Sequence, residues 1–291
     1  MIFFGNERLA TGLKTSTPTL KMLIESGYQL KAVISSYTEA TSRQKQPLEI
    51  AEVAKKNGLP LLLPDNLMSI KDDIAGYGAE AAVLVAFGRI IPSAIIDIFP
   101  KGIINIHPSL LPKYRGPTPI ETAILDGANE TGVSLMRLVA EMDAGPVYAQ
   151  KRLSLTTSET KQEIADKLLA CGRDLLKEHL PAILEGWLTP KPQNESDATY
   201  TKLIKKEDGK VDFGQPAEVI ERQVWAFAGW PKSQAKIHGQ DVIITKTRVA
   251  KDEKAGKLVM KCRPGWLEIQ ELVGPSGKTM QGADFLRGYR K

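Results

Sequence analysis

Short apolar runs alternate with amphipathic helical stretches from residue 2 to residue 186 of this 291-residue chain. The strand-like runs are residues 2–5, 30–35, 61–63, 81–86 and 103–107, and helical periodicity appears at 18–26, 48–57 and 119–125. This alternation is typical of a mostly parallel sheet with helices on both faces. It predicts a Rossmann-like α/β domain.

Two further strand-like runs, 132–139 and 147–155, and a long helical stretch at 160–184 complete this domain. The first strand leads into Gly5-Asn6-Glu7-Arg8, without a glycine triplet that enters a helix. A dinucleotide-binding turn of the usual kind is therefore not expected.

Residues 188–197 form a polar segment with two prolines, which is predicted as an extended linker. The alternation of strands and helices ends before this segment. Short alternating stretches broken by Gly and Pro then predict a small OB-like β-barrel. They lie at 235–238, 242–247, 257–262 and 266–272, after a helical stretch at 218–226. The expected domains are a sheet domain at 1–187, a linker at 188–204 and the barrel domain at 205–291.

The net charge of +5 is unevenly distributed. Residues 1–200 carry a net charge of −2, whereas residues 201–291 hold 18 Lys and Arg against 11 Asp and Glu, a net charge of +7. A basic domain beside a slightly acidic one is expected when one part does chemistry and the other binds a polyanion such as nucleic acid. A lysine-rich solvated surface is the alternative explanation.

Composition excludes several classes of protein. Hydrophobic residues make up 42% of the chain and charged residues 25%, which is ordinary for a globular protein and excludes disorder, collagen and coiled coil. The apolar run 81–87 is far shorter than the roughly 20 residues of a membrane helix, so no membrane association is expected. The chain begins with a strand-like run rather than a secretion signal, and we expect a cytoplasmic protein.

Neither a metal site nor a disulfide is expected from the cysteines and histidines. Cys171 and Cys262 lie 91 positions apart, and the three histidines are dispersed along the chain. Neither spacing is that of a metal-ligand cluster or of a disulfide framework.

The segment around the fifth predicted strand carries the candidate chemistry. Asn105 and His107 alternate with isoleucines, so the two polar side chains share one face of the strand. They lie at the carboxyl end, where open α/β sheets bind their ligands. An amide that donates to an oxyanion and an imidazole that moves protons suit acyl transfer. A structural polar pair at a strand end is the alternative.

Two other loops are expected at the same edge of the sheet. Asp143 lies in a tight segment between two predicted strands, where its carboxylate is placed to orient His107; a backbone cap in a turn is the alternative. Residues 86–92 follow the most apolar strand and are expected to supply backbone contacts and an apolar wall. A plain strand-to-helix turn is the alternative there.

Several longer motifs resemble the methionyl-tRNA formyltransferases, a family within the folate-dependent formyltransferases. In the first part they are VLVAFGRIIP (83–92), NIHPSLLPKYRG (105–116), ETGVS (130–134) and MDAG (142–145). In the second part they are TYTK (199–202), IKKED (204–208) and RQVWAF (222–227) before Trp230-Pro231. The resemblance covers nearly the whole chain and implies a formyl transfer from 10-formyltetrahydrofolate to the amine of methionyl-initiator tRNA, in translation initiation.

The resemblance also implies roles for individual residues. Asn105 becomes the oxyanion donor, His107 the acid–base group and Asp143 its partner, in a step that one imidazole can serve without a metal. The folate is expected to lie against Gly88, Arg89, Ile90, Ile91, Ser109, Leu110, Leu111 and Pro112. We expect a monomer.

The sequence departs from the family pattern in two places. A longer turn at residues 5–12 follows the first strand, and the loop 35–46 has only two basic residues where the family carries a basic motif that approaches the tRNA. We expect these two, Arg43 and Lys45, to contact tRNA phosphates, unless the loop is simply solvated. In the second domain Lys205, Lys206 and Lys210 are the expected tRNA contacts.

Other functions remain open from sequence alone. A formyltransferase that acts on an amino-sugar nucleotide would use the same three residues but needs no basic second domain. The hydrolase module of folate dehydrogenase belongs to a longer chain, and a glycinamide ribonucleotide formyltransferase would end near the linker. A non-catalytic RNA-binding protein would have no use for Asn105, His107 and Asp143 at one edge.

Overall fold

The computed structural model describes residues 1–14, 16–36, 49–156, 159–253 and 256–289. Its internal contacts divide the chain into two compact units. The first comprises Met1–Ile120 and Asn129–Lys202, and the second Glu121–Ala128 and Leu203–Lys291. The domain boundaries predicted above stay a prediction.

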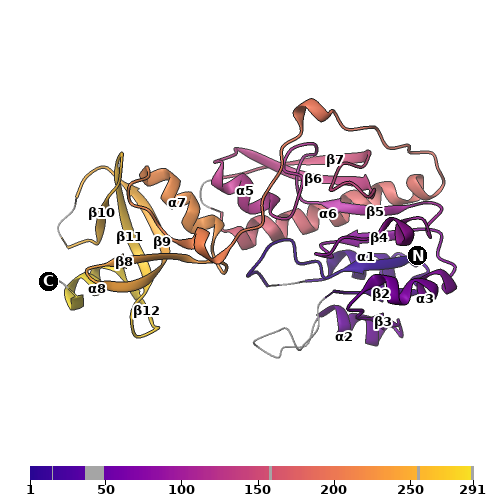
Figure 1. Ribbon diagram of the computed structural model, residues 1–291, viewed down its shortest axis with the longest axis horizontal. Helices are drawn as coiled ribbons and strands as arrows, with labels where there is room; N and C mark the ends of the chain where they lie inside the picture. Colours follow the sequence, from indigo (N-terminus) through magenta and orange to yellow (C-terminus); the bar gives the residue numbers. More distant parts are fainter. Residues whose placement is uncertain (15, 37–48, 157–158, 254–255, 290–291) are drawn as a thin grey trace. The chain divides into compact units, whose positions relative to one another are not determined.

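The first unit is built on a seven-stranded sheet in the order β3-β2-β1-β4-β5-β6-β7 (Figure 1). Its strands are β1 (Ile2–Gly5), β2 (Ala32–Ile34), β3 (Leu61–Leu62), β4 (Ala82–Val85), β5 (Ile103–His107), β6 (Glu130–Arg137) and β7 (Val147–Ser154). The pairings from β3 to β5 are parallel, and those of β6 and β7 are antiparallel. The predicted Rossmann-like, mostly parallel sheet is confirmed.

Helices cover both faces of this sheet. They are α1 (Pro18–Glu25), α2 (Glu49–Lys56), α3 (Lys71–Gly76), α4 (Ser93–Ile96) and α6 (Lys161–Leu184). Helix α5 (Pro119–Leu125) begins in this unit and belongs mostly to the second one. The long α6 begins at a capping box, in which Thr160 and Glu163 each accept a hydrogen bond from the other's backbone N–H group. It packs closely on β5 at Gly172, where a Cβ would lie 2.6 Å from Ile106 Cγ2.

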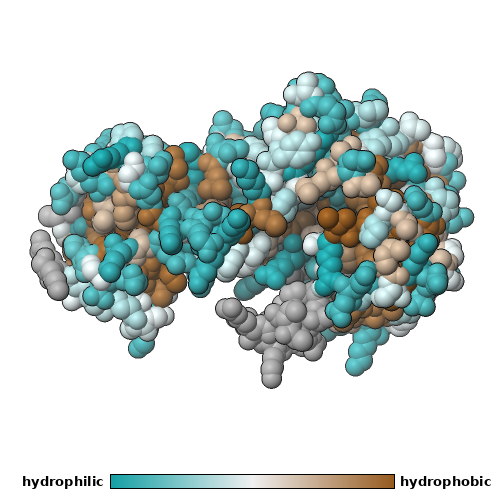
Figure 2. Space-filling view, in the orientation of Figure 1, coloured by the Kyte–Doolittle hydropathy of each residue, from teal (hydrophilic) through white to brown (hydrophobic). Residues whose placement is uncertain are grey.

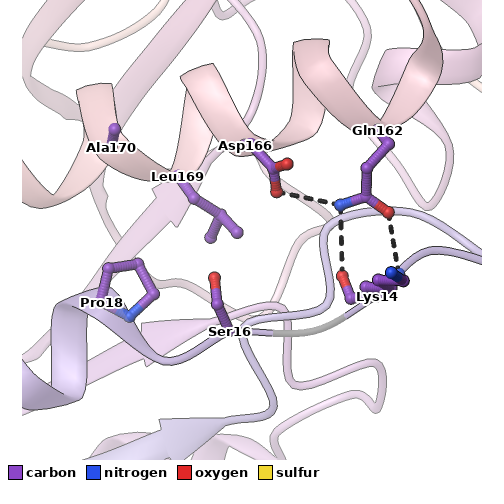
Figure 3. Close-up of a pocket in the computed structure, with 7 residues that line it drawn as sticks. All are labelled: Lys14, Ser16, Pro18, Gln162, Asp166, Leu169 and Ala170. Atoms are coloured by element: carbon purple, nitrogen blue, oxygen red, sulfur yellow. Dashed lines mark hydrogen bonds between the residues drawn. The ribbon is translucent and has the colours of Figure 1, made fainter.

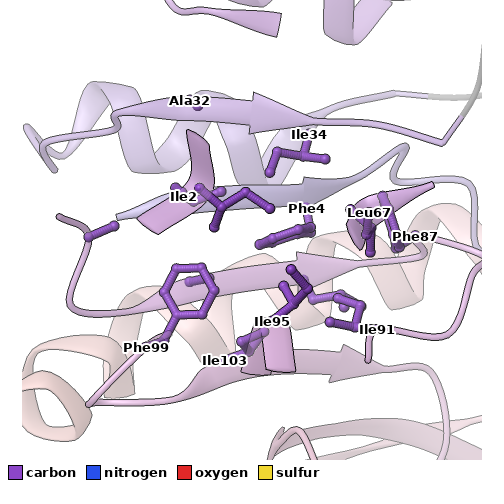
Figure 4. Close-up of a cluster of buried hydrophobic side chains, with 14 residues drawn as sticks. Ile2, Phe4, Ala32, Ile34, Leu67, Phe87, Ile91, Ile95, Phe99 and Ile103 are labelled. Carbon is purple, nitrogen blue, oxygen red and sulfur yellow. The ribbon is translucent and has the colours of Figure 1, made fainter. Parts of the chain in front are cut away.

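The opposite face of the sheet carries a buried apolar cluster, shown in Figure 4. Strands β1, β2, β4 and β5 supply it together with α3 and α4, which the sequence analysis did not predict. The ring of Phe4 lies edge-on to those of Phe87 and Phe99, with centroids 5.6 and 6.1 Å away. Ile103 belongs to this cluster, so Asn105 and His107 point to the same face, nearer the carboxyl end of β5.

In its described residues, the second unit contains a five-stranded antiparallel sheet and, besides α5, two further α-helices. Its elements are α7 (Ala217–Ala226), β8 (Ser233–Ile237), β9 (Gln240–Ala250), β10 (Val259–Lys261), β11 (Trp266–Val273), β12 (Thr279–Gln281) and α8 (Gly282–Tyr289). The order is β10-β11-β9-β8, with β12 paired to β11. Val224 of α7 and Phe285 of α8 pack with inward-facing strand residues such as Ile269. The predicted small β-domain is confirmed, although β12 and α8 were not predicted.

The surface of both units mixes hydrophilic and apolar side chains on the face that Figure 2 shows. Within the described residues, no helix combines the length and the apolar character that crossing a membrane requires.

The unusual turn after β1 contains the cap of helix α1. The N-cap residue Thr17 makes no side-chain hydrogen bond to the helix. Instead the Glu7 carboxylate accepts hydrogen bonds from the backbone N–H groups of Thr19 (3.0 Å) and Leu20 (2.8 Å). Burial raises the pKa of Glu7 to about 7, although these two hydrogen bonds act in the opposite direction.

This raised pKa predicts a pH-dependent stability. The folded chain retains the Glu7 proton up to about pH 7, whereas the unfolded chain releases it near the ordinary value of 4.5. The free energy of unfolding of the wild type should therefore fall, relative to Glu7→Gln, by about 3 kcal/mol as pH rises between these values. Denaturant unfolding at a series of pH values measures this difference.

Glu25→Gln, at the exposed end of the same helix, is the matched control. Unfolding curves of the wild type and Glu7→Gln that stay parallel from pH 4.5 to 7.5 would contradict the assignment.

Candidate active site

Asn105 and His107 lie at the end of β5, in the middle of the sheet. Both are buried, with exposed fractions of 6% and 5%. Parallel β4 lies on one side of β5 and antiparallel β6 on the other, with Ser134 opposite His107. The strand thus holds an amide and an imidazole side by side at the edge where open sheets bind ligands.

The structure brings Asp143 next to His107, although 36 positions separate them. His107 Nδ1 lies 3.6 Å from Asp143 Oδ1, while Nε2 lies 3.0 Å from the carbonyl oxygen of Tyr114. Because a carbonyl oxygen only accepts, Nε2 carries a proton in this arrangement. Nδ1 is therefore the nitrogen that faces the carboxylate.

Asp143 is held in a tight turn between β6 and β7. Its φ of 49° lies in the left-handed region, and its Oδ2 accepts a 2.8 Å hydrogen bond from the Gly116 N–H group. A Cβ at Gly145 would lie 1.9 Å from the Arg137 carbonyl oxygen, so only glycine fits there. The turn thereby fixes where the carboxylate points.

Residues 109–112 form a loop that β6 and β7 hold from one side. The Ser134 hydroxyl donates to the Ser109 carbonyl (2.7 Å) and accepts from the Leu111 N–H group (3.0 Å). The Gln150 amide donates to the Ser134 hydroxyl (2.8 Å) and to the Leu111 carbonyl (2.7 Å). Leu111 is buried, whereas Leu110 and Pro112 are half-buried. Ser134 and Gln150 could not be recognised as supports from the sequence, because only the register of three strands brings them to this loop.

Residues 88–91 lie at the end of β4, with Gly88 at a φ of 75°. The Arg89 guanidinium donates to the carbonyls of Ser36 and of the adjacent loop at residues 64–65. Ile91 is buried in the apolar cluster of Figure 4, whereas Ile90 is 80% exposed. Arg89 therefore joins three loops through hydrogen bonds. The exposed side chain of Ile90 is available to contact a ligand.

The predicted tRNA contacts belong to two other segments of the chain. Arg43 and Lys45 lie outside the described residues. Lys205, Lys206 and Lys210 are exposed around a short 3-10 helix of the second unit, Lys206–Gly209.

A surface hollow of about 550 Å³ lies elsewhere on the first unit, between the loop before α1 and helix α6 (Figure 3). Gln162 bonds there to the backbone of Lys14 and to Asp166. None of the predicted site residues lines this hollow.

The open α/β sheet, with an amide and an imidazole at the edge where such sheets bind ligands, makes this chain an α/β protein with a candidate site at that edge. Sequence comparison makes the class specific. Residues 20–180 match the family described as formyl transferase, and residues 203–290 match the formyl transferase C-terminal domain. The chain belongs to the formyl transferase family, whose members are one-carbon transferases.

Individual proteins that resemble this chain in sequence or in fold include other formyltransferases. A methionyl-tRNA formyltransferase from Pelobacter propionicus is 34% identical over 301 residues, which cover 99% of this chain and 92% of the relative. The N-formyltransferase from Helicobacter canadensis, solved with folinic acid and dTDP-3-aminofucose, superposes with a TM-score of 0.68 at 17% identity, covering 92% of this chain and 96% of that one.

A variant of HypX from Aquifex aeolicus also superposes, with a TM-score of 0.68 at 18% identity. The match covers all of this chain, which spans about half (48%) of the HypX chain. At these identities the two solved structures share the fold with this chain.

The loop at residues 109–112 should depend on Ser134. Ser134→Ala leaves the buried Leu111 N–H group without its acceptor, so the free energy of unfolding should fall by about 1–3 kcal/mol. Denaturant unfolding measures this loss. Ser154→Ala, at the exposed end of neighbouring β7, is the control. Equal losses in the two variants would contradict the support assigned to Ser134.

Proposed function

We propose that this chain transfers the formyl group of 10-formyltetrahydrofolate to the α-amino group of methionyl-initiator tRNA. One observation carries the choice of acceptor. The 34% identity to a methionyl-tRNA formyltransferase extends over 99% of the chain, through both the catalytic and the C-terminal parts. Formylation of this acceptor serves translation initiation.

The Asn105 amide stabilises the negative charge that develops on the formyl oxygen. A donor placed for that charge, in a site with little water, lowers the barrier more than it stabilises the ground state. Burial of Asn105 to 6% exposure supports this role.

His107 moves the proton. The attacking amine must lose a proton as the C–N bond forms, and the folate nitrogen N10 must gain one to leave. His107 Nε2 already donates to the Tyr114 carbonyl, so Nδ1 is the nitrogen that takes up and releases the proton. Asp143, 3.6 Å from Nδ1, orients the ring and interacts with the charge that forms there.

Two loops at the carboxyl ends of β4 and β5 fit the folate. Residues 109–112 form a loop whose backbone is held in place by Ser134 and Gln150, and a fixed loop of this kind suits a planar pteridine ring. The exposed side chain of Ile90 offers an apolar surface beside them.

The second unit supplies contacts to the tRNA backbone. Lys205, Lys206 and Lys210 are exposed there, within residues 201–291 whose net charge is +7. Arg43 and Lys45 add phosphate contacts from the loop at 35–46. The protein acts as a monomer in the cytoplasm, where its tRNA substrate is charged.

The acceptor is tested by offering three candidates with 10-formyltetrahydrofolate: methionyl-initiator tRNA, methionyl-elongator tRNA and an amino-sugar nucleotide. We expect formylation of the initiator tRNA at least about 100-fold faster, by kcat/KM, than of the elongator tRNA. Acid-gel or mass-spectrometric detection of formyl-methionyl-tRNA measures it.

Initiator tRNA without methionine, which lacks the α-amino group that accepts the formyl group, is the control. Formylation of the sugar nucleotide alone would favour the amino-sugar enzyme instead and overturn the proposal. Binding of tRNA without any formyl transfer would favour a non-catalytic RNA-binding protein.

A further inference from the structure

The segment between α6 and the second unit makes close contacts with the catalytic loops. We call residues 193–201 the strap. Backbone hydrogen bonds join it to the loop after β5: Arg115 N donates to the Thr199 carbonyl (2.9 Å), and Thr201 N donates to the Arg115 carbonyl (2.7 Å). Thr199 N also donates to the Pro112 carbonyl (3.2 Å). The strap therefore pairs with the loop as a short strand does.

Arg115 is buried under the strap, with an exposed fraction of 1%. Its Nε and Nη2 donate to Gln193 Oε1 (3.1 and 2.9 Å), and its two terminal nitrogens donate to the Glu195 carboxylate (2.9 and 2.7 Å). Nη1 also donates to the Tyr200 hydroxyl (3.0 Å). All five guanidinium N–H groups thus have acceptors, and every acceptor belongs to the strap.

Gln193 connects this arginine to the turn that carries Asp143. Its Oε1 accepts from Arg115, while its Nε2 donates to the carbonyls of Asp143 (2.8 Å) and Gly145 (2.7 Å). Asp143 has a left-handed φ of 49°, a conformation that the surrounding contacts must maintain. The amide of Gln193 does so by binding two carbonyls of the turn at once.

The strap also fixes the other groups around the imidazole. The Thr199 hydroxyl accepts from Tyr114 N (2.8 Å), and the Tyr114 carbonyl accepts from His107 Nε2. Gly116, which follows the paired Arg115, donates its N–H to the Asp143 carboxylate. Contacts with the strap therefore fix both groups that orient His107, the Tyr114 carbonyl and the Asp143 carboxylate.

We infer that the strap is part of the catalytic site and that Gln193 and Arg115 are positioning residues for formyl transfer. They act through Asp143 and His107 and touch no reacting atom. This inference rests on the proposed function for its kinetic effect. The sequence pattern of the strap, polar and with a proline before it, is that of a solvated linker, so its role comes entirely from its tertiary contacts.

Gln193→Glu removes the two hydrogen bonds that Gln193 donates to the turn carrying Asp143, and it keeps the acceptor for Arg115. The carboxylate still accepts from Arg115, but it has no N–H to donate and faces two carbonyl oxygens. The Asp143 turn should shift, and kcat for formyl transfer should fall about 10- to 100-fold, because small displacements of catalytic groups cost that much. KM for folate and for tRNA should change less than about threefold, since neither ligand is bound by Gln193.

The control is Gln29→Glu, which makes the same amide-to-carboxylate change at an exposed residue outside the strap. It should keep kcat within about twofold of the wild type. Where Gln193→Glu does not fold, Gln193→Ala removes the same two donors and serves the test, with circular dichroism confirming the fold.

A second measurement needs no substrate. The chain has three histidines, so the imidazole signals of His107 can be assigned in a ¹⁵N–¹H spectrum by comparison with His107→Gln. Gln193→Glu should move the His107 signals and leave those of His179 and His238 unchanged.

The two readouts separate the strap's role from the proposed function. Unchanged His107 signals together with a wild-type kcat would overturn the inference, and so would a raised KM at constant kcat, which would make the strap a substrate-binding surface. If the wild type fails to formylate methionyl-initiator tRNA, the proposed function fails, while the spectrum still decides whether the strap positions His107.

Discussion

The imidazole of His107 lies between the Tyr114 carbonyl and the Asp143 carboxylate, and the first unit is arranged to keep these three groups together. Strand β5 supplies the imidazole and the loop after it supplies the carbonyl. The carboxylate comes from a turn between two antiparallel strands. Gly145 allows the close backbone approach within this turn, and the Gly116 N–H group donates a hydrogen bond to the carboxylate. A proton-transfer site needs such fixed geometry, because a flexible imidazole would lose the orientation that makes its proton transfer efficient.

The sheet could be predicted from sequence because burial on both faces makes its parallel strands read as apolar runs. Residues 103–107 were predicted as a strand and are β5, with Asn105 and His107 on the expected face. Helices α3 and α4 were missed, since six and four residues are too short for helical periodicity to show. Strand β12, Thr279–Gln281, was also missed.

The supports of the candidate site could not be predicted in the same way. Ser134, Gln150 and Gln193 are ordinary polar residues in the sequence, and strand register or a folded-back segment brings each to its partner. Polar composition does not distinguish a solvated linker from a strap whose side chains satisfy a buried arginine. Glu7 is a similar case, because it caps a helix that begins eleven positions later.

The central claim is that the amide and imidazole at the end of β5 carry out formyl transfer. The most direct measurement is the single-turnover rate of transfer to methionyl-initiator tRNA by Asn105→Ala. The control is Asn129→Ala, at an exposed asparagine just before β6. The account predicts a rate about 100- to 1,000-fold below that of the wild type for Asn105→Ala, the usual cost of losing one oxyanion donor. A folded Asn105→Ala protein that transfers the formyl group within about threefold of the wild-type rate would contradict it.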